Sequence, residues 1–299
     1  MPTTRQRVAI AGSSGLIGGA LSSSLREGGH DVVHLVRREP AAGHERRWDP
    51  SRGRLEPAVL ADVDTVVHLG GAGIGDRRWT PGYKRLLRHS RIESTDLLAR
   101  TIAGGAGPTR LVTASAVGYY GDRGDEVLTE ASTGADDFLG RLVRDWEAAA
   151  DPARDAGVSV AHARTGIVLS RKGGALTPML RVGRLGLGGP LGSGRQWMPW
   201  ITLADVVAAY TRLVEDPAIT GPVNLTTPHP VRQRALARAI GHRLHRPAVL
   251  PAPRLAIRLV LGEFAGAALA SQQVLPQRLQ EVGFTHRHAT LDEALTHLL

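Results

Sequence analysis

Residues 7–18 read RVAIAGSSGLIG. A short apolar run ends at a glycine cluster, and residues 19–26 continue with the spacing of an amphipathic helix. Gly28 and Gly29 end that helix, and a second apolar run, DVVHLV, follows at residues 31–36. This order of segments predicts a strand, a tight turn, a helix and a second strand.

The same alternation continues along the chain. Residues 65–69 and 110–115 are apolar runs typical of buried strands, with a helical pattern over 90–103 between them, and strand-like stretches follow at 159–164 and 222–225. Strands that alternate with helices predict an α/β fold, here a Rossmann-like, doubly wound parallel sheet with helices on both faces.

The last part of the chain has a different character. After Pro247 it continues as helices interrupted by prolines, which predicts a smaller, mostly helical C-terminal lobe. We expect a cofactor-binding domain over residues 1–170, to which a later segment, about 200–228, returns. Residues 171–299 would then form a substrate or lid region and the helical lobe.

Composition excludes several classes of protein. The 299 residues include no cysteine, which excludes disulfides, a thiol nucleophile and a thiolate metal site. No stretch reaches the roughly 20 apolar residues of a membrane-spanning helix. The first residues are few and polar, so we expect no secretory signal and a cytoplasmic protein that does not partner a membrane.

The formal net charge of +9 suggests a polyanionic partner. Of the 37 basic residues only Lys84 and Lys172 are lysines, and the arginines are scattered without a dense run or a recognisable nucleic-acid-binding motif. We therefore expect no nucleic-acid partner, and nucleic-acid binding remains the weakest of three hypotheses.

The glycine turn has the spacing Gly12-x-x-Gly15-x-x-Gly18. In dinucleotide-binding turns the first glycine permits the bend, the second lets the backbone approach the pyrophosphate, and the third lets the helix pack on the strand. The alternative is a turn that merely packs tightly. We expect dinucleotide contacts from Gly12, Ser13, Ser14, Gly15, Leu16, Ile17 and Gly18.

The residues after the second strand indicate which dinucleotide is bound. An acidic side chain there would accept a hydrogen bond from a ribose 2′-hydroxyl, whereas a basic one would pair with a 2′-phosphate. This chain has Arg37 and Arg38, and a guanidinium can bind phosphate through two hydrogen bonds. NADP(H) is therefore the expected cofactor. The alternative is a pair of solvated arginines, which applies more to Arg38 than to Arg37.

Several motifs together resemble a known family. They are the glycine turn, DTVVHLG at 64–70, Ser115, SRIEST at 90–95, RTGIVL at 164–169, and LGLGGPLGSGRQ at 185–196. The chain resembles the extended short-chain dehydrogenase/reductases of the NAD-dependent epimerase/dehydratase type, and more narrowly the YfcH-like epimerase-family proteins.

The resemblance implies a Rossmann-like domain that binds NADP(H). It places Leu69 and Gly70 along the adenosine side of the cofactor, Arg91 near the cofactor and Val168 near the nicotinamide. A glycine at the carboxyl end of a strand independently suits close approach of a ligand. Instead of contacting the cofactor, Arg91 could be a structural cap or a surface residue.

The catalytic residues of the broad superfamily are missing here. That superfamily has an acid/base pair, a tyrosine and a lysine four residues later, some 20 to 30 residues after the serine. Residues 136–147 here read DDFLGRLVRDWE, with neither residue type. Ser115, Tyr119 and Tyr120 remain as candidate catalytic residues, since a hydroxyl and a phenol could polarise a carbonyl and donate a proton. Alternatively, the Ser115 hydroxyl only forms a hydrogen bond with the backbone, and the two tyrosines only pack in the core or contact the substrate.

One wall of a substrate site is expected at residues 195–200. A glycine-rich loop beside an arginine and indoles suits a lid over an anionic or flat ligand. The candidate residues of this substrate wall are Arg195, Gln196 and Trp200, together with Trp197. Equally, the tryptophans could anchor the second lobe. No metal site is expected, since the His242/His245 and His286/His288 pairs lack a third ligand.

Two main hypotheses follow. The first is an NADP(H)-dependent oxidoreductase or epimerase-like enzyme acting on an unknown small molecule, as a monomer or homodimer. The second is an NADP(H)-binding sensor or scaffold without turnover, which the missing tyrosine–lysine pair favours.

Overall fold

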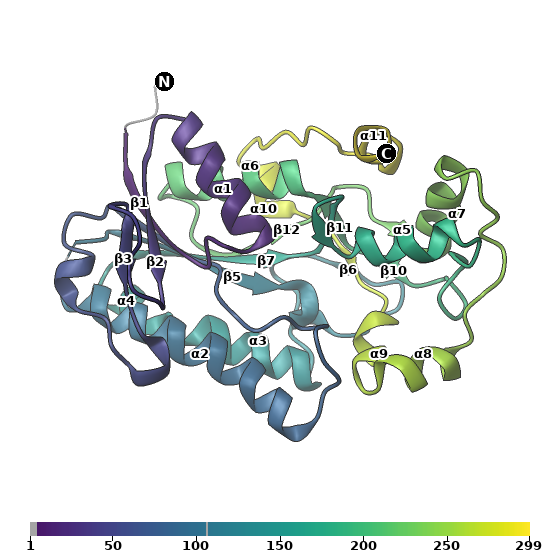
Figure 1. Ribbon diagram of the computed structural model, residues 1–299, viewed down its shortest axis with the longest axis horizontal. Coiled ribbons are helices and arrows are strands. Elements are labelled where there is room, and N and C mark those ends of the chain that lie inside the picture. Colours follow the sequence, from purple (N-terminus) through teal and green to yellow (C-terminus); the bar gives the residue numbers. More distant parts are fainter. Residues whose placement is uncertain (1–4, 106) are drawn as a thin grey trace.

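The computed structural model describes residues 5–105 and 107–299, and its centre is one parallel sheet (Figure 1). The sheet has seven strands in the order β12-β7-β5-β4-β1-β2-β3. They are β1 (Arg7–Ala11), β2 (Asp31–Val36), β3 (Glu45–Arg47), β4 (Thr65–His68), β5 (Arg110–Ala116), β7 (Ser159–Thr165) and β12 (Gly221–Leu225). The chain winds outward in both directions from the β1–β4 pair, which confirms the predicted doubly wound fold.

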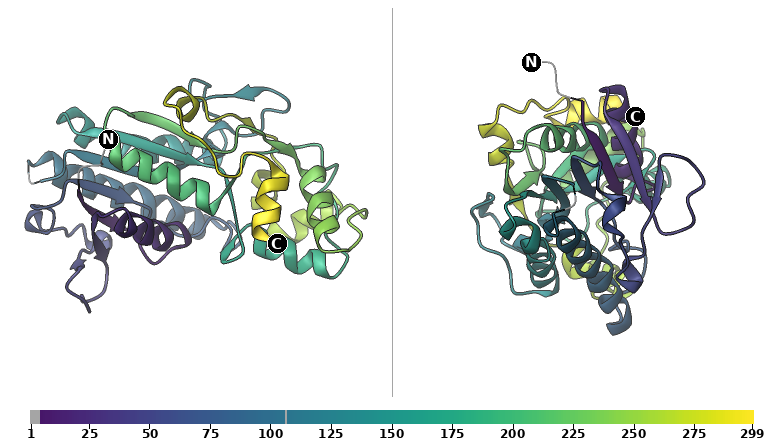
Figure 2. Two further views of the ribbon diagram at one scale, coloured as in Figure 1. Left: turned by 90° about the horizontal axis from the view of Figure 1, so that it is seen from above. Right: turned by 90° about the vertical axis from the view of Figure 1, so that its left-hand side faces the viewer.

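Helices cover both faces of this sheet (Figures 1 and 2). On one face lie α1 (Leu16–Glu27) and α6 (Leu203–Glu215), and on the other lie α2 (Pro81–Ala103), α3 (Phe138–Ala148) and α4 (Asp151–Asp155). Alternate residues of β1 enter two different cores, Val8 and Ile10 on the α1 face and Ala9 and Ala11 on the α2 face. Because both faces are buried, the strand reads as an unbroken apolar run.

The C-terminal part forms a smaller, mostly helical lobe beside the sheet, as predicted (Figure 1). A separate core joins α5 (Leu176–Arg184), α7 (Gln233–Arg243) and α11 (Leu291–Leu298). The remaining helices are α8 (Arg254–Leu261), α9 (Phe264–Ala268) and α10 (Gln277–Glu281). Among the described residues, no helix combines the length and apolarity needed to cross a bilayer.

Short strands connect the lobe to the main body. One small sheet pairs β6 (Val127–Leu128) with β14 (Gln273–Val274). A second has β8 (Ile167–Ser170) between β9 (Gly173–Gly174) and β11 (Trp200–Thr202). A third pairs β10 (Trp197–Met198) with β13 (Val231–Arg232). Residues 200–225 supply β11, α6 and β12, so this later segment returns to the main sheet.

A buried carboxylate at the start of α6 holds the C-terminal segment in place. Asp205 is fully buried and accepts hydrogen bonds from the backbone N–H groups of Arg287 at 2.6 Å and His288 at 3.2 Å. It also accepts one from the Thr202 hydroxyl at 2.7 Å, and Thr202 is the residue that caps the helix. Asp205 therefore ties residues 287–288 to the body of the protein.

Candidate functional site

The glycine turn packs directly on the end of β4. Gly12 has a φ of +89°, and a Cβ there would lie 2.8 Å from the backbone nitrogen of Gly70. A Cβ on Gly18 would lie 2.2 Å from the carbonyl oxygen of Gly12. Only glycine fits either position without a shift of the backbone, so the turn is built for close contact between β1, α1 and β4.

The first turn of α1 has no side chain that caps it. Its N-cap is Gly15, and its first turn contains no acidic residue, whereas Thr80 caps α2 and Asp137 caps α3. The free backbone N–H groups and the positive end of the helix dipole suit an anion. Ser14 and Gly15 are exposed there, which leaves this helix end accessible.

Other predicted cofactor residues surround the same end of the sheet. Ile17, Leu69 and Val168 are partly buried and pack against one core cluster. Leu16 lies against the β8–β9 hairpin, since a Cβ on Gly174 would be 3.4 Å from a Leu16 methyl group. The fold thus brings the turn, the end of β4 and the strand that carries Val168 together.

Arg91 reaches from α2 to the backbone after β4. A Cβ on Gly71 would lie 3.2 Å from its Cζ, and the guanidinium donates to the Leu87 carbonyl at 3.2 Å and lies 5.1 Å from the Trp146 ring centre. No carboxylate of the described residues pairs with it, and burial lowers the pKa of Arg91 to about 10. This half-buried cation is available for an anion.

The two arginines after β2 differ in their contacts. Arg38 makes a bidentate ion pair with Glu45, at 2.5 and 2.8 Å, and this pair holds the pKa of Glu45 at about 2. Arg37 is exposed and has no ion pair with a described residue. Arg37 is therefore the guanidinium that is ready to bind a ligand at this end of the sheet.

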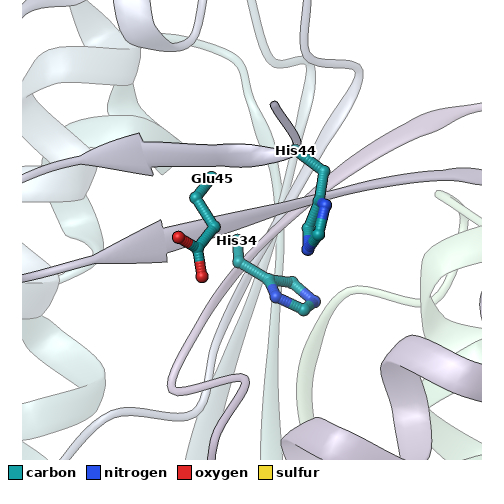
Figure 3. Close-up of side chains that lie close together, drawn as sticks. All are labelled: His34, His44 and Glu45. Atoms are coloured by element: carbon teal, nitrogen blue, oxygen red, sulfur yellow. The ribbon is translucent and has the colours of Figure 1, made fainter. Parts of the chain in front are cut away.

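One cluster near these arginines was missed by the sequence analysis. His34 on β2, His44 and Glu45 each place one potential metal-ligating atom within 4.8 Å of the others (Figure 3). The ring centres of the two histidines are 5.1 Å apart, edge to face. Nothing in the spacing of these three residues signals the cluster, because it depends on the pairing of β2 with β3.

Ser115, at the end of β5, belongs to a buried polar network. Its hydroxyl donates to Glu147 on α3 at 2.5 Å, and both oxygens of Glu147 accept from Arg164 on β7 at 2.8 Å. Strand register places Ser115 beside Arg164. Ser115 and the Arg164 side chain are each only 4% exposed. The carboxylate neutralises a guanidinium that would otherwise be buried alone.

The two tyrosines that follow β5, in the 3₁₀ turn Val117–Tyr120, have different surroundings. Tyr120 is fully buried; its hydroxyl donates to Asn224 at 2.7 Å and accepts from Arg164 at 3.1 Å, and burial raises its pKa to about 12. Tyr119 is half-buried, with the Arg164 guanidinium 3.5 Å from its ring centre. Of the two, only Tyr119 presents surface to a ligand.

The helix that would carry the tyrosine–lysine pair is α3. Its residues, FLGRLVRDWEA, include neither a tyrosine nor a lysine. Arg144 on this helix pairs at the surface with Asp136 at 2.7 Å. The helix therefore lacks the pair.

The expected substrate wall is only partly open. Arg195 is exposed and lines a cavity of about 270 Å³, together with Asp122, Asp125, Leu191, Ser193, Arg232 and Arg254 among others. Gln196 lines it too, but it is buried and donates to the Leu191 carbonyl at 3.1 Å. Trp200 is fully buried in the core of the C-terminal lobe, which favours the anchoring role.

Sequence reasoning missed Glu147, Asn224 and the role of Arg164. Arg164 does carry a signal, because a charged residue inside an apolar strand pattern requires a buried partner. Its partner could not be identified, since Glu147 lies 17 residues away and Asp151 and Asp155 are nearer in the sequence.

Comparison with known proteins agrees with the fold and the turn. Residues 8–141 match the model of the NAD dependent epimerase/dehydratase family, and residues 252–298 match a domain of unknown function, DUF1731. An epimerase family protein of Mycobacterium bovis is 46% identical over 96% of both chains, and one of Staphylococcus aureus is 34% identical over 97% of this chain and 98% of that protein.

Two solved structures are similar over nearly the whole chain. The human epimerase family protein SDR39U1, solved with NADPH, has a TM-score of 0.89 and 34% identity, with 98% of each chain covered. A nucleoside-diphosphate sugar epimerase from Corynebacterium glutamicum has a TM-score of 0.83 and 38% identity; 99% of this chain spans only 58% of that one. Because the relatives at 34–46% identity match over nearly the whole length of this chain, it belongs to the epimerase family proteins of the NAD-dependent epimerase/dehydratase type.

Proposed function

We propose that this protein binds NADP(H) in the crevice at the carboxyl ends of β1, β4 and β5, and uses it in an oxidoreductase or epimerase-like reaction on a small molecule. The observation that carries the proposal is the uncapped start of α1 behind a glycine turn that packs on Gly70. Arg91 lies against the next residue, Gly71, and pairs with no carboxylate of the described residues. The similar human protein was solved with NADPH, which supports the choice of nucleotide.

The residues present fit such a cofactor. The turn from Gly12 to Gly18 and the α1 N-terminus would hold the phosphates. Arg37 would bind the 2′-phosphate, with Arg38 available only when it leaves Glu45. Leu69 and Gly70 would lie along the adenosine side and Val168 near the nicotinamide, which when bound supplies or accepts a hydride.

Proton transfer would fall to Tyr119, because it is the one tyrosine of the pair with exposed surface. The Ser115 hydroxyl already donates to Glu147, so toward a substrate it would act as a hydrogen-bond acceptor rather than as a donor. Tyr120 would support the site from behind, since both hydrogen-bonding sides of its hydroxyl are occupied.

A second candidate is an NADP(H)-binding sensor or scaffold without turnover. The burial of Ser115 and Tyr120 favours it, because a substrate could touch neither residue without a local movement. Both candidates suit a cysteine-free cytoplasmic protein, monomeric or homodimeric, that partners neither nucleic acid nor a membrane.

The cofactor proposal is tested by thermal unfolding with NADPH, NADP⁺, NADH and NAD⁺. A ligand at 100 times its dissociation constant stabilises the folded state by roughly 2.7 kcal/mol, so NADPH should raise the midpoint clearly. No shift with any nucleotide would remove the proposal.

Turnover is tested separately, by following NADPH oxidation against a panel of carbonyl compounds. The enzyme hypothesis predicts activity that Tyr119→Phe abolishes while NADPH binding is retained. Binding without turnover of any compound favours the sensor or scaffold, and equal activity in Tyr119→Phe would exclude Tyr119 as the proton donor.

A further inference from the structure

We propose that His34, His44 and Glu45 form a binding site for a divalent transition-metal ion of the zinc type. The three side chains come from β2, from the residue before β3 and from the first residue of β3, and their potential ligand atoms lie within 4.8 Å of one another (Figure 3). Two imidazoles and one carboxylate are a donor set that zinc uses in proteins.

The Nε2 atom of His34 is engaged by neighbouring side chains. It lies 3.1 Å from the Ser22 hydroxyl, which donates to the Gly18 carbonyl at 2.8 Å, and 3.3 Å from the Arg26 guanidinium. In the tautomer that binds a metal ion through Nδ1, Nε2 carries the proton and donates it to the Ser22 oxygen, and the Arg26 contact is then not a hydrogen bond. Histidines that ligate metals characteristically donate their other N–H in this way.

The other two ligands can adjust to an ion. Around tetrahedral zinc the ligand atoms are roughly 3.3 Å apart, given bond lengths near 2.0–2.1 Å, so the cluster must contract by at most roughly 1.5 Å. His44 is exposed, and its ring makes no hydrogen bond to a described residue, so it can rotate. Glu45 accepts from Arg38 and from the Ala41 N–H at 2.7 Å, so an ion that takes its carboxylate must displace Arg38.

Metal binding would change the neighbouring arginine. An ion that takes the Glu45 carboxylate releases Arg38, which then stands beside Arg37 as a second free guanidinium at the end of β2. This consequence rests on the proposed function: zinc should then tighten NADPH binding, because NADPH has a 2′-phosphate, and leave NADH binding unchanged.

The site is tested by calorimetric titration of tag-free, cofactor-free protein with Zn²⁺. One ion per chain should bind, and His44→Ala and Glu45→Gln should each weaken binding by tenfold or more. His89→Ala is the matched control, because His89 is also an exposed histidine beside a carboxylate, Glu93, but outside the cluster. Its zinc affinity should equal that of the wild type.

Equal zinc affinity in the wild type and His44→Ala, or no binding to the wild type, would overturn the metal site. The release of Arg38 is tested by NADPH titrations with and without Zn²⁺: tighter binding in the wild type, absent in Arg38→Ala, supports it, and no effect in the wild type contradicts it. If NADPH does not bind at all, the proposed function fails, while the zinc isotherms still decide the metal site.

Discussion

Replacing Arg37 by alanine separates NADPH from NADH. Arg37 is exposed and has no ion pair with a described residue, so no existing contact has to break before it binds phosphate. Hydrogen bonds to charged groups contribute about 1.5–3 kcal/mol. At about 1.4 kcal/mol per tenfold change in affinity, Arg37→Ala should weaken NADPH binding by roughly 10- to 100-fold and leave NADH binding unchanged.

The assay is calorimetric titration of each variant with both nucleotides. Arg38→Ala is the matched control in metal-free buffer, because the Arg38 guanidinium is already bound to Glu45 and must leave it to reach a phosphate. We expect its loss of NADPH affinity to be less than about threefold, because Arg38 adds a phosphate contact only if it gives up its bidentate pair with Glu45, whose side chain is 10% exposed. Equal losses of NADPH and NADH affinity in Arg37→Ala would refute the assignment of the 2′-phosphate site.

Three further predictions concern stability, measured by urea unfolding. Glu147→Gln leaves the buried Arg164 charge unpaired and should lower the free energy of unfolding by about 3 kcal/mol. The matched control Asp136→Asn breaks an exposed pair and should leave the free energy of unfolding nearly unchanged. Similar losses in the two variants would contradict the network. Burial lowers the pKa of His68 from 6.5 to about 4, so the unfolded chain takes up the proton first as pH falls. The free energy of unfolding should therefore decrease by up to roughly 3 kcal/mol as the pH falls from 6.5 to about 4. If the free energy of unfolding of His68→Asn falls as steeply with pH as that of the wild type, this prediction is wrong. Asp205→Ala removes the acceptor for two backbone N–H groups and should cost about 3 kcal/mol, a cost that an unchanged urea midpoint would exclude.

The first strand, turn and helix could be predicted from the sequence because their signals are local. The apolar run of β1, the three glycines and the helical spacing of α1 all lie within 20 residues, and β1 is buried on both faces. The position of Arg37 and Arg38 directly after β2 is also a local signal, but the contacts that distinguish the two arginines are not. Which arginine is free depends on Glu45, which reaches Arg38 only because β3 pairs with β2.

The catalytic region could be predicted only in part. Ser115 and Tyr119 stand out as polar residues after an apolar strand, yet their burial and partners depend on how α3 crosses β5 and β7. Trp200 shows the opposite difficulty, since an indole beside a glycine-rich loop suits a lid and a core equally, and only packing decides. Interactions between distant segments leave no spacing that a single sequence can reveal.

The proposal that this chain binds NADP(H) at the glycine turn is tested most directly by hydrogen exchange, followed by mass spectrometry with and without saturating NADPH. Backbone amides of residues 12–19, at the turn and the uncapped start of α1, should be protected, and so should residues 69–71. The β14 and α10 region, residues 273–281, serves as the internal reference and should not change. Binding of NADPH without protection of residues 12–19 would contradict the proposed site.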